Sequence, residues 1–201
     1  MAESELPDGS WSILPCQNED AHLFSSNEHI KAISFTGSAA VGWKIKANAG
    51  KKRVLLELGG NAPVVVDETA DLQRAADRIT FGAFYSQGQS CISVQRVFVH
   101  EQVYDQLMPL LVQRAQALKR GDPMSEDVFL GPLITENDAV RLENWVKKAE
   151  MGGAKVLTGG KRDGSFFGMK CIPNLSNSLL DATIIEQVPA NVELACQEAF
   201  G

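Results

Sequence analysis

The sequence predicts an α/β fold, because short strand-like segments alternate with segments of helical periodicity along the whole chain. Glycine stands at several of the junctions between these segments, as expected where a strand turns into a helix. Alternation of this kind favours a largely parallel sheet. The 201 residues are 44 % hydrophobic and 22 % charged, which is enough for one sizeable core, or for one domain and part of another.

The first half of the chain alternates strands and helices in this way. Apolar runs predict the strands, and the second of them leads directly into Thr36-Gly37-Ser38. The segment after Ser38 carries Val41 and Ile45 four residues apart, and a longer segment ending at Tyr85 places its apolar residues at helical spacing. We therefore expect strands over 11–14, 31–35, 53–58 and 63–66, and helices over 38–49 and 71–85.

The second half continues the pattern with clearer helix boundaries. An alternating strand is followed by a helix with one leucine-rich face, which we expect to stop at Gly121-Asp122-Pro123. Thr135 and Asp138 resemble a capping box at the start of the next helix, and Gly152-Gly153 ends it. The expected elements are strands over 95–100, 154–157 and 183–185 and helices over 101–120 and 135–150; residues 159–178 read as a loop.

Composition excludes several classes of function. The net charge of −6 argues against a nucleic-acid partner, and no run approaches the roughly 18 apolar residues that span a bilayer. The acidic N-terminus has no apolar segment typical of a secretory signal, which favours a cytoplasmic protein. Scattered histidines and the absence of a Cys-x-x-Cys pair make a structural metal improbable. We expect the thiols to be reduced, at Cys16, Cys91, Cys171 and Cys196.

The segment Ser86-Gln87-Gly88-Gln89-Ser90-Cys91 carries the first candidate group, a thiol just past a predicted helix. Gly88 allows a sharp turn that leaves the sulfur uncovered, and a thiolate is a strong nucleophile toward a carbonyl carbon. The alternative is that Cys91 is a small buried hydrophobe, which is the usual place of a lone cysteine.

Two further segments carry candidate groups. Glu57 ends a strand just before Gly59-Gly60, where ligands gather in α/β sheets, and a partly desolvated carboxylate there suits general-base work. Its alternative is a glutamate that points to solvent. The run Phe35–Gly42 combines a strand, a glycine turn and a helix start, whose amides attract phosphate. A generic strand-to-helix junction capped by Ser38 explains that run equally well.

Together these segments resemble the NAD(P)-dependent aldehyde dehydrogenase superfamily. The glycine turn, Glu57-Leu58-Gly59-Gly60 and Gly88-Gln89-Ser90-Cys91 occur in the family's order and approximate spacing. A fourth segment, Gln197-Glu198-Ala199-Phe200-Gly201, is similar to the family's glutamate-x-phenylalanine-glycine segment. Independent motifs in the right order rarely coincide.

The resemblance implies a role for each matching residue. Cys91 corresponds to the nucleophile that forms a hemithioacetal and then a thioester, and Glu57 to the base that activates water to hydrolyse it. The Cys91 backbone amide would supply one oxyanion donor. The cofactor, NAD or NADP, is implied to lie near the remaining matching residues, which are Gly37, Ser38, Gly42, Leu58, Gly59, Glu198 and Phe200.

The resemblance also implies the domain organisation. Residues 1–58 correspond to part of an incomplete Rossmann-type nucleotide-binding sheet, and residues 59–201 to a parallel-sheet α/β catalytic domain that lacks its C-terminal end. The family's upstream oxyanion-hole asparagine and ribose-binding lysine, and its oligomerisation segment, are not matched. We therefore expect an aldehyde as substrate and impaired turnover, with homo-oligomers typical of family members and no nucleic-acid or membrane partner.

Three functions remain open from the sequence. The chain can carry out its part of aldehyde oxidation with NAD(P)⁺. Alternatively, Cys91 and Glu57 hydrolyse activated esters without a cofactor, as a residual thiol esterase. In the third, the chain is a non-catalytic remnant or an interaction module. The sequence does not distinguish NAD from NADP, nor does it identify the aldehyde.

Overall fold

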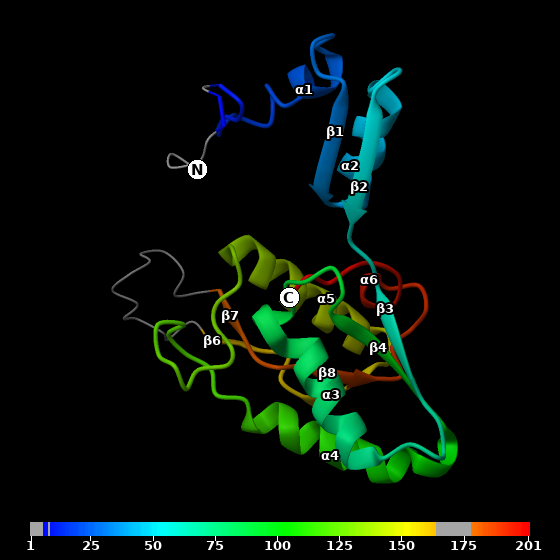
Figure 1. Ribbon diagram of the computed structural model, residues 1–201. Helices are drawn as coiled ribbons and strands as arrows, with labels where there is room; N and C mark the ends of the chain where they lie inside the picture. The colour runs from blue at the N-terminus through cyan, green and yellow to red at the C-terminus, as the bar shows by residue number, and fades with distance from the viewer. Residues whose placement is uncertain (1–5, 8, 164–177) are drawn as a thin grey trace. The chain divides into compact units, whose positions relative to one another are not determined.

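The computed structural model describes residues 6, 7, 9–163 and 178–201, and the chain divides into two compact units. The first unit is Met1–Leu58 and the second unit is Gly59–Gly201. Both combine helices with strands (Figure 1). Among the described residues, no helix combines the length and the apolar character needed to cross a membrane.

The first unit is a parallel two-stranded sheet with a helix on one face. Its elements are α1 (His22–Ser26), β1 (Ala32–Gly37), α2 (Ala39–Asn48) and β2 (Arg53–Leu58). The register runs from Ala32 opposite Arg53 to Gly37 opposite Leu58, so the carboxyl ends of both strands lie at the same edge. Alternate residues of β2 are half-buried, and Gly42 of α2 packs against Leu58. The exposed face includes Leu55 and Glu57.

The second unit contains the larger core and most of the helices. Its strands pair as β3 with β4 in parallel, and as β5 with β8 and β6 with β7 in antiparallel ladders. Its elements are β3 (Ala62–Val66), α3 (Leu72–Phe84), the 3-10 helix η1 (Tyr85–Gly88), β4 (Val94–Val99), α4 (Glu101–Ala117), α5 (Glu136–Met151), β5 (Lys155–Thr158), β6 (Arg162–Asp163), β7 (Leu179–Leu180), β8 (Ile184–Glu186) and α6 (Glu193–Cys196).

The main apolar core lies where α3 and α4 cover one face of β3 and β4. Leu107 of α4 is fully buried there, and Val66 of β3 is 4 % exposed. Val65, which precedes Val66 in β3, is 76 % exposed, because successive side chains of a strand point to opposite faces. The buried members of this cluster are Val66, Ala76, Ile79, Leu107 and Leu111.

Local capping explains where the helices begin. The Asp71 carboxylate accepts a hydrogen bond from the Arg74 amide at 3.1 Å, which caps α3. The expected capping box opens α5: the Thr135 hydroxyl accepts from the Asp138 amide at 3.1 Å and donates to the Asp138 carboxylate at 2.6 Å. Gly152 and Gly153 follow the end of α5 as predicted.

The α/β class and most of the expected elements are confirmed, and three details differ. Residues 11–14 form no strand; Trp11, Ile13 and Leu14 are exposed, and no strand of the described residues pairs with them. The helix expected over 101–120 ends at Ala117, because the Lys119 carbonyl accepts hydrogen bonds from the amides of residues 129 and 130. Two of the four described strand pairs are antiparallel.

Several short elements were not predicted from the sequence. They are α1, η1, β6, β7 and α6, each between two and five residues long and too short for a periodic pattern. The loop expected over 159–178 includes β6, while residues 164–177 and Cys171 lie outside the described residues. The three described thiols, Cys16, Cys91 and Cys196, are free.

The adjacent valines of β3 give a matched test of this core. Val66→Ala should lower the free energy of unfolding by about 2 kcal/mol, because it removes buried methyl groups. Val65→Ala makes the same change of strand propensity at an exposed position and should cost about 0.5 kcal/mol or less. Urea unfolding followed by circular dichroism measures both. Equal losses in the two variants would show that the packing described for β3 is incorrect.

A tyrosine–carboxylate pair links α4 to β8 and predicts a pH dependence. The Tyr104 hydroxyl donates to the Glu186 carboxylate, and this bond, with burial, raises the pKa of Tyr104 to about 12. Its stabilising contribution is therefore complete below the unfolded value of about 10 and disappears as pH rises through about 12. The difference in unfolding free energy between wild type and Tyr104→Phe should shrink between pH 10 and 12. A constant difference across that interval contradicts the bond.

Candidate active site

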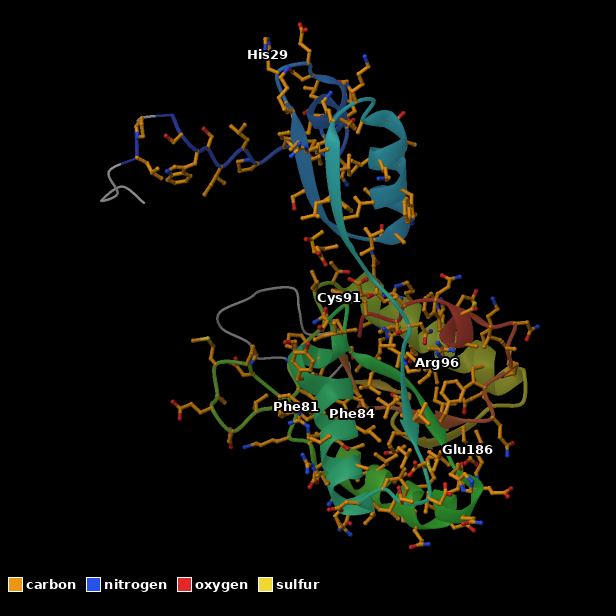
Figure 2. All side chains as sticks on the ribbon, turned by 45° about the vertical axis from the view of Figure 1, so that its right-hand side comes forward. His29, Phe81, Phe84, Cys91, Arg96 and Glu186 are labelled. Carbon is orange, nitrogen blue, oxygen red and sulfur yellow. The ribbon has the colours of Figure 1, made fainter. Side chains whose placement is uncertain are left out.

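Cys91 lies exposed on a tight turn between η1 and β4 of the second unit. The Ser93 amide donates to the Ser90 carbonyl at 3.0 Å, and this bond closes the turn around Cys91 and Ile92. Figure 2 shows Cys91 beyond the end of α3, well away from Glu186. The exposed thiol agrees with the expectation of an uncovered sulfur rather than a buried hydrophobe.

Three consecutive left-handed residues reverse the chain before Cys91. The φ angles of Ser86, Gln87 and Gly88 are 50°, 58° and 71°. A left-handed conformation costs about 1–2 kcal/mol at each non-glycine residue, so surrounding contacts must hold this segment. A Cβ at Gly88 would lie 2.8 Å from the Gly201 carbonyl carbon and 3.2 Å from the Ala83 carbonyl oxygen, so the position has no room for a side chain.

Hydrogen bonds anchor the chain on both sides of Cys91. Before it, the hydroxyls of Tyr85 and Ser90 lie 2.6 Å apart, and the Gln89 side-chain oxygen accepts from the Ile134 amide at 2.8 Å. After it, the Ser93 hydroxyl donates to the Ala83 carbonyl at 2.9 Å. The backbone that carries the thiol is therefore held by the C-terminal end of α3 and by the segment before α5.

The glycine pair at the start of the second unit lies between Cys91 and Glu198. A Cβ built on Gly59 would overlap the Glu198 carboxylate, and the Gly60 amide donates to the same carboxylate at 3.3 Å. On its other side, a Cβ on Gly60 would lie 3.9 Å from the Cys91 carbonyl oxygen. The fold therefore brings Gly59, Glu198 and the thiol turn into one region of the second unit.

Three polar side chains hold the segment that carries Glu198 and Phe200. Asn61 donates to the Gln197 carbonyl at 2.8 Å, and Arg141 of α5 donates to the Ala199 carbonyl at 2.9 Å. Gln95 of β4 accepts from the Ala199 amide at 2.8 Å. Phe200 itself is half-buried and has a φ of 52°.

The remaining predicted residues lie at one edge of the first unit. Gly37 ends β1, and Ser38 caps α2 without a hydrogen bond from its side chain to the first turn. Gly42 is buried against Leu58 and leaves no space for a Cβ, so these two residues pack the helix onto β2. A glycine at position 37 also makes room for the Phe35 ring, which a Cβ would approach to 2.7 Å.

Glu57 lies opposite Thr36 in the parallel ladder, one residue before the end of β2. It is exposed, on the face of β2 that α2 does not cover. Residues of the first unit therefore do not desolvate this carboxylate as the sequence interpretation expected. Its role as a base for chemistry at Cys91 stays a prediction.

The described parts of the chain contain no group of three or more His, Cys, Asp or Glu side chains that could hold a metal ion. A cavity of about 860 Å³ in the second unit is bounded by α3, β4, α4 and β8, and Cys91 does not line it. The thiol lies instead on the exposed turn.

Sequence analysis missed Gln95, Asn61 and Arg141. Asn61 follows the glycine pair directly, which was the only local signal for any of them. Gln95 and Arg141 both bond to the backbone of Ala199, at sequence separations of 104 and 58 positions. No local sequence pattern predicts such contacts.

The fold and the described site define an α/β protein with an exposed thiol on a tight turn, close to a glycine pair and a carboxylate. The model of the aldehyde dehydrogenase family matches residues 1–201. The chain therefore belongs to the aldehyde dehydrogenase family.

Curated relatives and solved structures agree with this assignment. Benzaldehyde dehydrogenase [NAD(+)] of Pseudomonas putida is 37 % identical over 203 residues, which cover 100 % of this chain and 39 % of the relative. Aldehyde dehydrogenase 21 from Physcomitrella patens, solved with the reaction product succinate, has a TM-score of 0.84 and 42 % identity over 94 % of this chain and 37 % of its own.

A third relative is the glyceraldehyde-3-phosphate dehydrogenase GapN from Methanocaldococcus jannaschii, solved with NADP. It has a TM-score of 0.79 and 38 % identity, covering 89 % of this chain and 36 % of its own. The chain spans about two fifths of the length of the curated relatives it matches.

Gly88→Ala tests the packing of the turn. The alanine would meet both the left-handed backbone and the Gly201 and Ala83 carbonyls, so the free energy of unfolding should fall by about 2–4 kcal/mol. Gly160→Ala is the control, because Gly160 has a similar φ of 80° but approaches only the Val146 and Val156 methyl groups, at 3.3 Å or more. Its loss should be about 1–2 kcal/mol. Equal losses in urea unfolding would mean that Gly201 does not pack on the turn.

Proposed function

We propose that this protein contributes the thiol and the base for oxidation of an aldehyde to a carboxylic acid with NAD⁺ or NADP⁺. The observation that carries the proposal is the exposed Cys91 thiol on a turn anchored at both sides. Membership of the aldehyde dehydrogenase family supports the reaction class. Because the chain spans about two fifths of its relatives, the activity of a whole enzyme is itself part of the proposal.

The first step is addition of Cys91 to the aldehyde. The thiolate sulfur forms a bond to the carbonyl carbon, and the π electron pair moves to oxygen, giving the oxyanion of a hemithioacetal. The Cys91 amide is the proposed donor to that oxygen. The tight turn supports this step because it presents the sulfur to solvent while neighbouring hydrogen bonds hold the backbone still.

The cofactor residues are proposed in both units. In the first unit, α2 begins after Gly37, and the Ser38 side chain makes no capping bond to its first turn, which suits amides that bind a pyrophosphate. Gly42 and Leu58 would hold that helix on the sheet. In the second unit, Glu198 and Phe200 would hold the nicotinamide ribose beside Gly59. When bound beside Gly59, NAD⁺ or NADP⁺ would supply the hydride acceptor that the oxidation needs.

The last step is hydrolysis of the thioester at Cys91. Glu57 removes a proton from water as the water oxygen attacks the acyl carbon, and the carbon–sulfur bond then breaks to return the thiolate. The product leaves as a carboxylic acid. The position of Glu57 near the carboxyl end of β2, two residues before Gly59 in the sequence, supports this role.

We assign residues 1–58 to part of a nucleotide-binding domain and residues 59–201 to a catalytic domain, which agrees with the division into two units. The named relatives act on aldehydes of different chemistry, so their names do not select one substrate for this chain. We further propose that the protein is cytoplasmic.

A cofactor-independent thiol esterase is the second candidate. It is favoured by one observation, the free and exposed state of Cys91. Such an activity would need Cys91 and Glu57 but none of the cofactor residues. Hydrolysis of p-nitrophenyl acetate without NAD(P)H formation would identify it, and silence in both assays would favour a non-catalytic module.

Cys91→Ser and Glu57→Gln test the proposed function. With a simple aldehyde and NAD⁺ or NADP⁺, Cys91→Ser should abolish NAD(P)H formation because the nucleophile is lost. Glu57→Gln should slow steady turnover by about 10²–10⁴-fold while a burst of one NAD(P)H per Cys91 remains. Cys196→Ser, at another exposed free thiol, is the control and should keep wild-type activity. Full activity in Cys91→Ser would refute the proposal.

A further inference from the structure

We infer that Gln95 is a positioning residue, which sets the place of the Glu198 carboxylate by bridging the glycine pair to the Glu198 segment. The inference rests on the proposed function, because Glu198 is the proposed cofactor contact. The two hydrogen bonds of the Gln95 side chain go to backbone atoms of Gly60 and Ala199. Neither bond involves the thiol or a side chain of a proposed cofactor residue.

The Gln95 amide makes one bond at each end. Its Nε2 donates to the Gly60 carbonyl at 2.9 Å, and its Oε1 accepts from the Ala199 amide at 2.8 Å. The Gly60 amide in turn donates to Glu198 Oε1 at 3.3 Å, and Ala199 is the next residue after Glu198. These three bonds form a closed ring that joins β4, the glycine pair and the Glu198 segment.

Geometry makes the ring specific for glutamine. Glutamine carries a donor nitrogen and an acceptor oxygen as two separate atoms at one tip, as the Gly60 carbonyl and the Ala199 amide require. Asparagine has the same groups but is shorter by one methylene, about 1.5 Å, so it cannot reach both partners. Glutamate keeps the length and the acceptor, but when ionised it has no N–H for the Gly60 carbonyl.

The hydrogen bond from the Gly60 amide is a weak support for the Glu198 carboxylate, and the ring adds to it. The carboxylate rests against Gly59 and receives one amide bond of 3.3 Å, which is at the long end for a hydrogen bond. Asn61 and Arg141 hold the carbonyls of residues 197 and 199 from other directions. Among the hydrogen bonds of the described residues, those of the Gln95 side chain join the glycine pair directly to the backbone of Ala199. Without Gln95, the spacing between Gly60 and Glu198 should therefore be held less firmly.

Hydrogen exchange of the 201-residue protein tests the positioning directly. In Gln95→Asn, the Ala199 amide should exchange about tenfold faster because it loses its acceptor. The Gly60 amide should also exchange faster, although its nitrogen does not contact Gln95, because the Glu198 carboxylate no longer stays in place. Gln106→Ala, an exposed glutamine on α4, is the control and should leave both amides unchanged. Unchanged exchange at Gly60 in Gln95→Asn would overturn the inference.

A kinetic split separates positioning from general damage. Gln95→Asn and Gln95→Glu should raise the KM for NAD⁺ or NADP⁺ about tenfold, while the rate of Cys91 alkylation by iodoacetamide stays at the wild-type value. An equal loss of thiol reactivity, or an unchanged KM alongside faster exchange, would overturn the positioning role. If the wild-type protein forms no NAD(P)H, the proposed function fails, and the Gly60 exchange rate alone decides the role of Gln95.

Discussion

The close approach of the Glu198 carboxylate to the backbone of Gly59 and Gly60 is the contact on which the described site depends. It joins segments 138 residues apart, and it exists because Gly59 has no Cβ. Any side chain at position 59 would occupy the space of the carboxylate. A Cβ on the neighbouring Gly60 would lie 3.9 Å from the Cys91 carbonyl oxygen, so the two glycines bring the carboxylate and the thiol turn into a common region.

The C-terminal residues tie the two parts of this region together. Glu198 rests on the glycine pair, while Gly201 packs against Gly88 at the left-handed turn before Cys91. Polar side chains from β4 and α5 then fix the intervening backbone. The thiol turn is therefore supported by residues that follow it by more than 100 positions. This arrangement explains how a turn with two strained residues, Ser86 and Gln87, persists at an exposed place.

Much of the fold follows from local rules in the sequence. The strand at Arg53–Leu58 was predicted from an apolar run, and the helix after Asp71 from the helical spacing of its apolar residues. The helix after Thr135 was predicted from its capping box, and all three elements form. The expected strand over 11–14 fails because an apolar run needs a neighbouring strand to pair with. The early end of α4 has a similar cause, since the chain after Ala117 bonds to residues 129 and 130 instead of continuing the helix.

The sequence by itself determined the chemistry that the protein carries: a thiol at Cys91, carboxylates at Glu57 and Glu198, and the glycines that leave room around them. These are properties of residue type and order, which local patterns and family motifs express. Only the tertiary structure decided that Gln95 joins Gly60 to Ala199 and that Gly201 packs on Gly88. Such contacts depend on how distant segments meet in space, and a single hydrogen bond between them leaves no periodic trace in the sequence.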